Sequence, residues 1–191
     1  LSEPSQRVFY ERRITQLVRA DRLLAISGFS RDEAMSTLNL EANRVINISA
    51  AVAPGFRSPT GIEQVAPNFI ASLRDWGVRD QFVLYVPGGH DARKNFERLF
   101  AAYALLPEGL RQRYQLVITG KLDKGRADLL MSYARAADLT GDDLVLVDYV
   151  TDERLRDLYR QAALFVFPSL HEGFGLPVLE AMTCHAPVIA A

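Results

Sequence analysis

The feature that most constrains the fold is a series of short apolar runs that alternate with helical stretches after residue 80. The runs are nearly continuous and of strand length, and they are QFVLYV (81–86), QLVIT (115–119), LVLV (144–147), LFVF (164–167) and PVIAA (187–191). Continuous apolar runs of this length are typical of parallel strands that helices cover on both faces. The second part of the chain is therefore predicted to be an α/β domain with a doubly wound parallel sheet.

The first 50 residues repeat the alternation on a smaller scale. Residues 14–18 are predicted to belong to a helix, and residues 23–26 to a short strand. Ser30, with Glu33 three positions later, is predicted to cap the next helix as a capping box, and residues 44–48 form a second strand. This αβαβ segment predicts the remnant of another domain.

A linker is predicted between the two regions, because residues 49–67 hold three prolines and two glycines and show little periodicity. The predicted boundaries are residues 1–55 for the remnant with its hinge and residues 56–191 for the α/β domain. The sequence begins without methionine and ends inside an apolar run. It is therefore expected to be an excised fragment, with the second domain truncated at its end.

Composition excludes several classes of function. The chain carries 22 basic and 23 acidic residues, so no bulk attraction to nucleic acid or to an anionic membrane is expected. One cysteine, Cys184, excludes an internal disulfide framework and fits a reducing compartment. No stretch approaches the roughly 18 apolar residues that span a bilayer. We therefore expect a soluble or peripherally attached protein.

Polar residues gather where the predicted strands end. These segments are PGGHDARKN (87–95), GKLDKG (120–125), DYVTD (148–152) and PSLHEGFG (168–175). Because ligands of doubly wound sheets bind at the carboxyl ends of the strands, glycines, basic residues and a carboxylate are expected at one edge. The combination predicts a ligand with a diphosphate at its centre.

Arg93 and Lys94 are predicted at or near the start of a helix that continues through Tyr103. A cation there costs roughly 0.3–1 kcal/mol unless an anion is bound. This favours a phosphate site, with a solvated pair of side chains as the alternative. Gly88 and Gly89 permit close backbone approach to a ligand, although a tight turn explains them nearly as well.

Two further basic side chains have weaker support. Lys121 follows Gly120 at the end of a predicted strand, and phosphate contact and plain surface charge remain equally open for it. His90 can donate to an anion when protonated, but a lone histidine is more often an ordinary loop residue.

The segment from Glu172 to Glu180 is more specific. Gly173 and Gly175 flank Phe174, and Pro177 suits the first position of a helix. The backbone amides of Phe174 to Leu176 can then face an anion. Glu180 is expected in the first helical turn, where it can accept both hydroxyls of a ribose. Glu172 is expected on the other side of the diphosphate. The alternative is that both glutamates are ordinary surface and helix-terminal charges.

These motifs resemble the retaining glycosyltransferases of the two-Rossmann-domain (GT-B) type, in family four (glycosyl transferases group 1), and the mannosyltransferases in particular. The acidic pair in EGFGLPVLEAM (172–182) matches the family's signature, and FVLYVPGGHDARKNFERLFAAY (82–103) resembles its phosphate loop. The resemblance extends over nearly the whole chain, since LLAISGFSRDEA (23–34) is similar to the end of the family's amino-terminal domain.

The resemblance implies a role for each matching residue. Lys94, with Gly89 and Arg93 nearby, would bind the diphosphate, and Gly173, Phe174 and Gly175 would supply main-chain amides. Glu180 would hold the ribose, and Glu172 would act as the catalytic carboxylate at the donor hexose. The base would lie against Tyr149 and Val150, with Lys121 close by.

The same resemblance implies transfer of a hexose, with mannose favoured, from a nucleotide sugar to a saccharide or lipid-linked acceptor, with retention of configuration. GDP-mannose is the favoured donor and a UDP-sugar the alternative, and neither a cofactor nor a metal is implied. A cytoplasmic location is expected, with peripheral attachment at the inner face of the membrane as a further option for the full-length protein. The fragment alone is expected to transfer little sugar.

Two rival functions belong to other classes. A non-catalytic module that binds nucleotide sugars would show the same motifs without needing Glu172 for chemistry. A dehydrogenase or kinase is disfavoured because the chain has neither GxGxxG after a first strand nor GxxxxGK[ST]. Three residues depart from the family pattern: His90 after the loop glycines, Asp148 before the base-binding pair and His185 at a predicted helix end.

Overall fold

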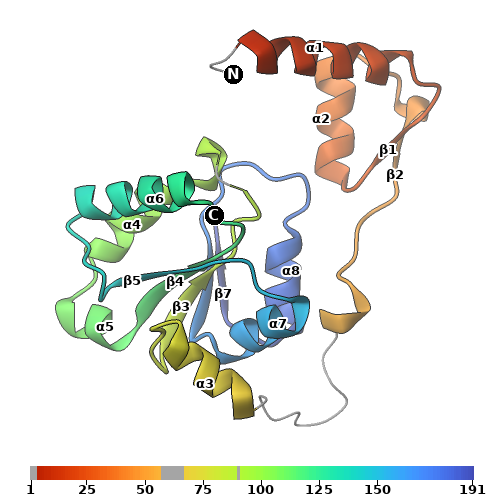
Figure 1. Ribbon diagram of the computed structural model, residues 1–191. Helices are drawn as coiled ribbons and strands as arrows, with labels where there is room; N and C mark the ends of the chain where they lie inside the picture. Colours follow the sequence, from red (N-terminus) through yellow and green to blue (C-terminus); the bar gives the residue numbers. More distant parts are fainter. Residues whose placement is uncertain (1–3, 57–66, 90) are drawn as a thin grey trace. The chain divides into compact units, whose positions relative to one another are not determined.

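The computed structural model describes residues 4–56, 67–89 and 91–191 (Figure 1). The chain forms two compact units, Leu1–Ala51 and Val52–Ala191. This division falls a few residues before the boundary predicted between residues 55 and 56. Most of the predicted linker lies outside the described residues.

The first unit has the predicted αβαβ order. It contains helix α1 (Pro4–Arg19), strand β1 (Leu23–Ala25), helix α2 (Gly28–Leu38) and strand β2 (Val45–Asn47). The two strands are parallel, with Leu23 opposite Val45. Only Ala25, Leu40 and Val45 are buried hydrophobic residues of this unit's small core, so most apolar side chains described in it remain exposed.

The predicted capping box at the start of α2 is wrong. Ser27, in extended conformation, is the N-cap residue, and its hydroxyl accepts a hydrogen bond from the Ser30 amide at 2.9 Å. Ser30 therefore lies inside the first turn. The helix begins earlier than predicted because the Ser27 hydroxyl satisfies a first-turn amide.

The second unit contains the predicted parallel sheet. Its strands are β3 (Phe82–Tyr85), β4 (Gln115–Thr119), β5 (Leu144–Val147), β6 (Leu164–Phe167) and β7 (Val188–Ala190). Their order is β5-β4-β3-β6-β7, and every pairing is parallel. Each apolar run of the sequence thus supplies one strand. All five residues of β4 are buried, as expected for a strand that is covered on both faces.

Helices cover both faces of this sheet. Figure 1 shows α4 (Phe96–Ala104) and α6 (Lys124–Ala136) on one side, and α7 (Asp152–Gln161) and α8 (Leu176–Thr183) on the other. Helices α3 (Pro67–Asp75) and α5 (Glu108–Arg113) complete the domain. The domain therefore has the doubly wound α/β architecture that the sequence predicts.

The core lies between the sheet and these helices, and its largest side chains are aromatic. Tyr159 of α7 meets Phe165 of β6 edge-on, with ring centroids 5.3 Å apart, and Phe165 stacks on Phe167 at 6.1 Å. All three are almost completely buried. Such packing fixes where β6 ends, and the polar loop that follows β6 is positioned with it.

Candidate functional site

The site is built on the loops that follow β3, β4, β5 and β6. Strand β3 lies between β4 and β6, so the connections on its two sides run in opposite directions across the sheet. A crevice opens at such a switch point, outside the carboxyl ends of the strands. The polar segments that the sequence places after each strand therefore meet at one edge.

An ion pair joins the first and last of these loops. Lys94 Nζ lies 2.5 Å from Glu172 Oε1, although the residues are 78 positions apart in sequence. Only 10% of the Lys94 side chain and 26% of the Glu172 side chain are exposed. A lysine this well buried needs a counter-charge, and Glu172 supplies it. The two residues predicted to face one ligand thus contact each other directly.

The turn that carries Lys94 lies near the start of a helix that continues through Tyr103, as predicted. Arg93 and Lys94 lie in a short 3₁₀ turn (Ala92–Lys94), and α4 begins only at Phe96, after Asn95. The helix starts later because Asn95 adopts a left-handed conformation that interrupts helical geometry.

The two predicted cations of this turn have different surroundings. Arg93 is exposed, and its guanidinium contacts both carboxylate oxygens of Asp91, at 2.8 and 3.2 Å. This contact holds the pKa of Asp91 below its ordinary value. Lys94 instead points inward to Glu172. Arg93 is therefore paired at the surface, whereas Lys94 is paired inside the site.

Of the two explanations for the glycines before this turn, the geometry supports the tight turn. Gly88 has φ +66°, a conformation in which a side chain is strained. At Gly89, a Cβ atom would lie 3.6 Å from Lys94 Cε, in ordinary contact. Gly88 is therefore needed for the turn, whereas a Cβ atom at Gly89 would meet no clash. His90 lies outside the described residues.

A cavity of about 360 Å³ adjoins this turn, above the ends of β3, β4 and β5. Four predicted site residues line it, namely Gly89, Lys121, Tyr149 and Val150. Lys121 Nζ lies 5.9 Å from the centre of the Tyr149 ring, within cation–π range. The cavity therefore brings together the residues expected at the base. Its size and mixed lining suit a nucleoside.

Sequence reasoning missed one charged residue of this cavity, Arg126, and gave no role to another, Asp152. Arg126 pairs with Asp123 in the first turn of α6, and Asp152 begins α7. Arg126 lies one residue beyond the segment GKLDKG, and Asp152 is the last residue of the segment DYVTD. Including the first turn of each following helix would have found Arg126.

Asp148 links two of the loops that border the cavity. Its Oδ1 accepts hydrogen bonds from the amides of Leu122 and Tyr149, at 3.1 and 2.6 Å, and these lower its pKa. The Thr119 hydroxyl donates to its carbonyl oxygen at 3.2 Å. The departure from the family pattern at this position thus makes a contact between loops.

The glycine-rich segment leads into α8 slightly earlier than predicted. Gly175, with φ +84°, is the N-cap residue, Leu176 begins the helix and Pro177 follows it. The prediction that Pro177 takes the first helical position is therefore wrong by one residue, and the proline is tolerated because first-turn amides need no intrahelical acceptor. The backbone amides of Phe174 to Leu176, at the start of α8, remain the predicted binding site for the anion.

Glu180 lies in the second turn of α8, so its predicted place in the first turn is wrong. The Tyr159 hydroxyl donates to its Oε2 at 3.0 Å, and burial raises the pKa of the carboxyl above its ordinary value of 4.5. Asp152 adds to this shift through its negative charge. Glu180 is thus a half-buried acceptor held from below by Tyr159.

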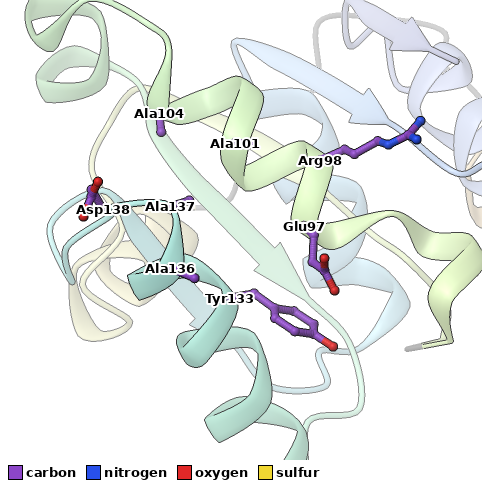
Figure 2. A pocket seen from close by; sticks show the side chains of 8 residues that line it. All are labelled: Glu97, Arg98, Ala101, Ala104, Tyr133, Ala136, Ala137 and Asp138. Atoms are coloured by element: carbon purple, nitrogen blue, oxygen red, sulfur yellow. The ribbon is translucent and has the colours of Figure 1, made fainter.

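A separate cavity of about 620 Å³ lies between α4 and α6 (Figure 2). Alanines line much of it, and Glu97, Arg98, Tyr133 and Asp138 supply its polar side chains. No residue of the four strand-end loops contributes to this cavity. It carries none of the predicted site residues.

Among the described residues there is no group of three or more histidine, cysteine or acidic side chains that could hold a metal ion. No helix in the described part of the chain is long and apolar enough to cross a membrane.

The parallel sheet with its flanking helices defines a Rossmann-like domain of the GT-B glycosyltransferase type. Residues 74–191 match the family "Glycosyl transferases group 1", and the chain belongs to this family. It is 37% identical over its whole length to the serotype-specific mannosyltransferase WbdA of Escherichia coli, and 34% identical over 98% of its length to the O-antigen chain mannosyltransferase B of that species. The chain spans only 23% and 48% of these two relatives.

Solved structures show the same fold. Sucrose-phosphate synthase from Thermosynechococcus elongatus superimposes on 99% of the chain with a TM-score of 0.73 and 27% identity, and the chain covers 44% of it. The Anabaena protein HepE, in complex with UDP and glucose, gives a TM-score of 0.72 at 21% identity, over 94% of this chain and 47% of that protein.

Proposed function

We propose that this chain forms the donor-binding half of a retaining glycosyltransferase that transfers a hexose, mannose in the first instance, from a nucleotide sugar. The observation that carries the proposal is the Lys94–Glu172 pair beside the cavity lined by Tyr149 and Val150. A nucleotide sugar has three parts, and each has a counterpart here. The cation would bind the diphosphate, the carboxylate would bind the hexose, and the cavity would bind the base.

The donor would bind with its base in this cavity and its diphosphate between Lys94 and the first amides of α8. Glu180, half-buried and already bonded to Tyr159, would accept the ribose hydroxyls. Glu172 would exchange its contact with Lys94 for hydroxyls of the hexose. The named relatives support mannose as the sugar. GDP-mannose is therefore the first donor to test, with a UDP-sugar as the alternative that the HepE complex suggests.

The chemical step is proposed to depend on electrostatic stabilisation. When the bond between the anomeric carbon and the diphosphate breaks, negative charge grows on the leaving oxygen. Lys94 and the amides of Phe174 to Leu176 would stabilise that charge, as preorganised donors do in other enzymes. The acceptor, a saccharide or a lipid-linked saccharide, would attack the face from which the diphosphate leaves, which retains the configuration. No covalent nucleophile is assigned.

Calorimetric titration of the 191-residue chain with GDP, UDP, ADP and their sugars tests the donor site. We expect one base to bind clearly more tightly than the others, and Glu180→Ala to weaken that binding by roughly tenfold, since hydrogen bonds to a charged group contribute about 1.5–3 kcal/mol. Equally weak binding of all nucleotides, unchanged by Glu180→Ala, would contradict the site assignment.

Catalysis is tested in the full-length protein. Glu172→Ala should abolish sugar transfer while much of the nucleotide affinity remains. Transfer that survives the substitution would favour the other candidate, a non-catalytic module that binds nucleotide sugars. The 191-residue chain alone is proposed to bind nucleotide but to transfer little sugar. Robust turnover by this chain would contradict the proposal.

A further inference from the structure

Asn95 has an unusual combination of backbone and side-chain geometry. Its φ and ψ are 59° and 37°, a left-handed conformation that asparagine tolerates better than most residues but that still costs energy. It is the N-cap residue of α4, yet its side chain makes no capping hydrogen bond. An asparagine at this position ordinarily stabilises its own helix. Both features indicate that the side chain is used elsewhere.

The side chain of Asn95 reaches across to the loop that carries Glu172. Its Nδ2 donates to the Pro168 carbonyl oxygen at 2.9 Å. A second bond runs in parallel, because the Leu170 amide donates to the Arg93 carbonyl at 2.8 Å. These two bonds join the turn that holds Lys94 to the segment that leads into Glu172. The Lys94–Glu172 contact lies directly beyond them.

The same turn is also held from below. The hydroxyl of Tyr85, the last residue of β3, donates to the Lys94 carbonyl oxygen at 2.8 Å. Tyr85 is completely buried, and burial raises the pKa of its hydroxyl, which stays protonated and remains a donor. Tyr85 therefore fixes the height of the turn above the sheet. Asn95 fixes its distance from the neighbouring loop.

We propose that Asn95 is a positioning residue for the site: by bonding to the Pro168 carbonyl, it holds the Lys94 ammonium within reach of both Glu172 and the donor diphosphate. The diphosphate part rests on the proposed function, whereas the ion-pair part does not. The competing explanation is that Asn95 is present only because asparagine tolerates the left-handed backbone that the turn requires. The two explanations differ in whether losing the amide group affects Lys94.

The first experiment measures the coupling between Lys94 and Glu172. A double-mutant cycle with Lys94→Met and Glu172→Gln, followed by urea unfolding, gives the interaction between the two side chains. The cycle is repeated in the Asn95→Gly variant, in which glycine adopts the left-handed conformation freely but has no amide to donate. If Asn95 positions the lysine, the coupling should fall by about half or more. An unchanged coupling would overturn the proposal.

Asn39 provides a matched control, because it also has a left-handed conformation, with φ 50°, but lies in the first unit. Asn39→Gly should leave the Lys94–Glu172 coupling unaltered. Asn95→Asp is a second variant, since aspartate tolerates the same backbone but cannot donate to Pro168. It should reduce the coupling as Asn95→Gly does, and full coupling in Asn95→Asp would also count against the proposal.

The second experiment uses GDP as the probe. We expect Asn95→Gly to raise the dissociation constant roughly tenfold, about 1.4 kcal/mol, and to have no further effect when Lys94 is already methionine. Additive effects in the two backgrounds would show that Asn95 does not act through Lys94. If GDP, UDP and ADP all fail to bind the unmodified chain, the proposed function fails, and the coupling measurement still decides the role of Asn95.

Discussion

Lys94 Nζ and Glu172 Oε1 lie 2.5 Å apart, so the cation proposed for the diphosphate is neutralised by the carboxylate proposed for the hexose. Under the proposed function, the phosphates of the donor compete with Glu172 for the Lys94 ammonium. Weakening the Lys94–Glu172 contact costs free energy, and this cost would lower the affinity of the site for the phosphates.

The first prediction is that Glu172→Gln strengthens the binding of GDP and of inorganic pyrophosphate. Glutamine keeps the size of the side chain but removes the charge that competes for Lys94. Because a charged hydrogen bond contributes about 1.5–3 kcal/mol and glutamine retains part of it, we expect a gain of several-fold, measured by calorimetry. Glu108→Gln, at an exposed site on α5, removes the same charge and should have no effect. Weaker binding in Glu172→Gln would argue against competition.

The second prediction concerns the stability of the chain without ligand. Lys94→Met should lower the free energy of unfolding by about 1–3 kcal/mol, because it leaves the partly buried Glu172 carboxylate without its cation. Adding Glu172→Gln should recover much of that loss, since no unpaired charge remains. Urea unfolding of the two variants measures both effects. A double variant no more stable than Lys94→Met would show that packing of the lysine stem, rather than its charge, is decisive.

The third prediction concerns Asp148, whose Oδ1 joins the loops that carry Lys121 and Tyr149. Asp148→Ala removes both hydrogen bonds and should weaken nucleotide binding by roughly three- to tenfold. Asp148→Asn keeps an acceptor oxygen and should bind nearly as the unmodified chain does. Equal losses in both variants would mean that the negative charge matters and the loop contact does not. Calorimetry with the preferred nucleotide measures the difference.

The fourth prediction follows from the raised pKa of Glu180. The folded chain holds this proton more tightly than the unfolded chain, so this carboxyl lowers stability as the pH rises from about 4.5, its ordinary pKa, through the raised folded value. Glu180→Gln should remove this contribution, and the difference in unfolding free energy between the two proteins should grow with pH across that range. The same substitution should weaken nucleotide binding. A constant difference across that range would show that Glu180 does not titrate as its burial implies.

Several expectations about the site came directly from local sequence. The apolar runs define the strands, and the order of the chain then places PGGHDARKN and PSLHEGFG after β3 and β6. Both segments follow strands at the same edge of the sheet, so Lys94 and Glu172 were expected near one ligand. Helix starts were harder to predict, as at Ser27, Asn95 and Leu176, because capping depends on which of several suitable residues the preceding strand delivers in the right conformation.

Sequence alone determined the parallel α/β architecture, the edge of the sheet that carries the polar residues and the family to which the chain is similar, because all three depend on periodicity and on short motifs. Only the tertiary structure decided which of these residues touch. The Lys94–Glu172 pair, the bond from Asn95 to Pro168 and the bond from Tyr159 to Glu180 each join segments that are distant in the chain. Such contacts depend on strand order and side-chain burial, which no local pattern of residues encodes.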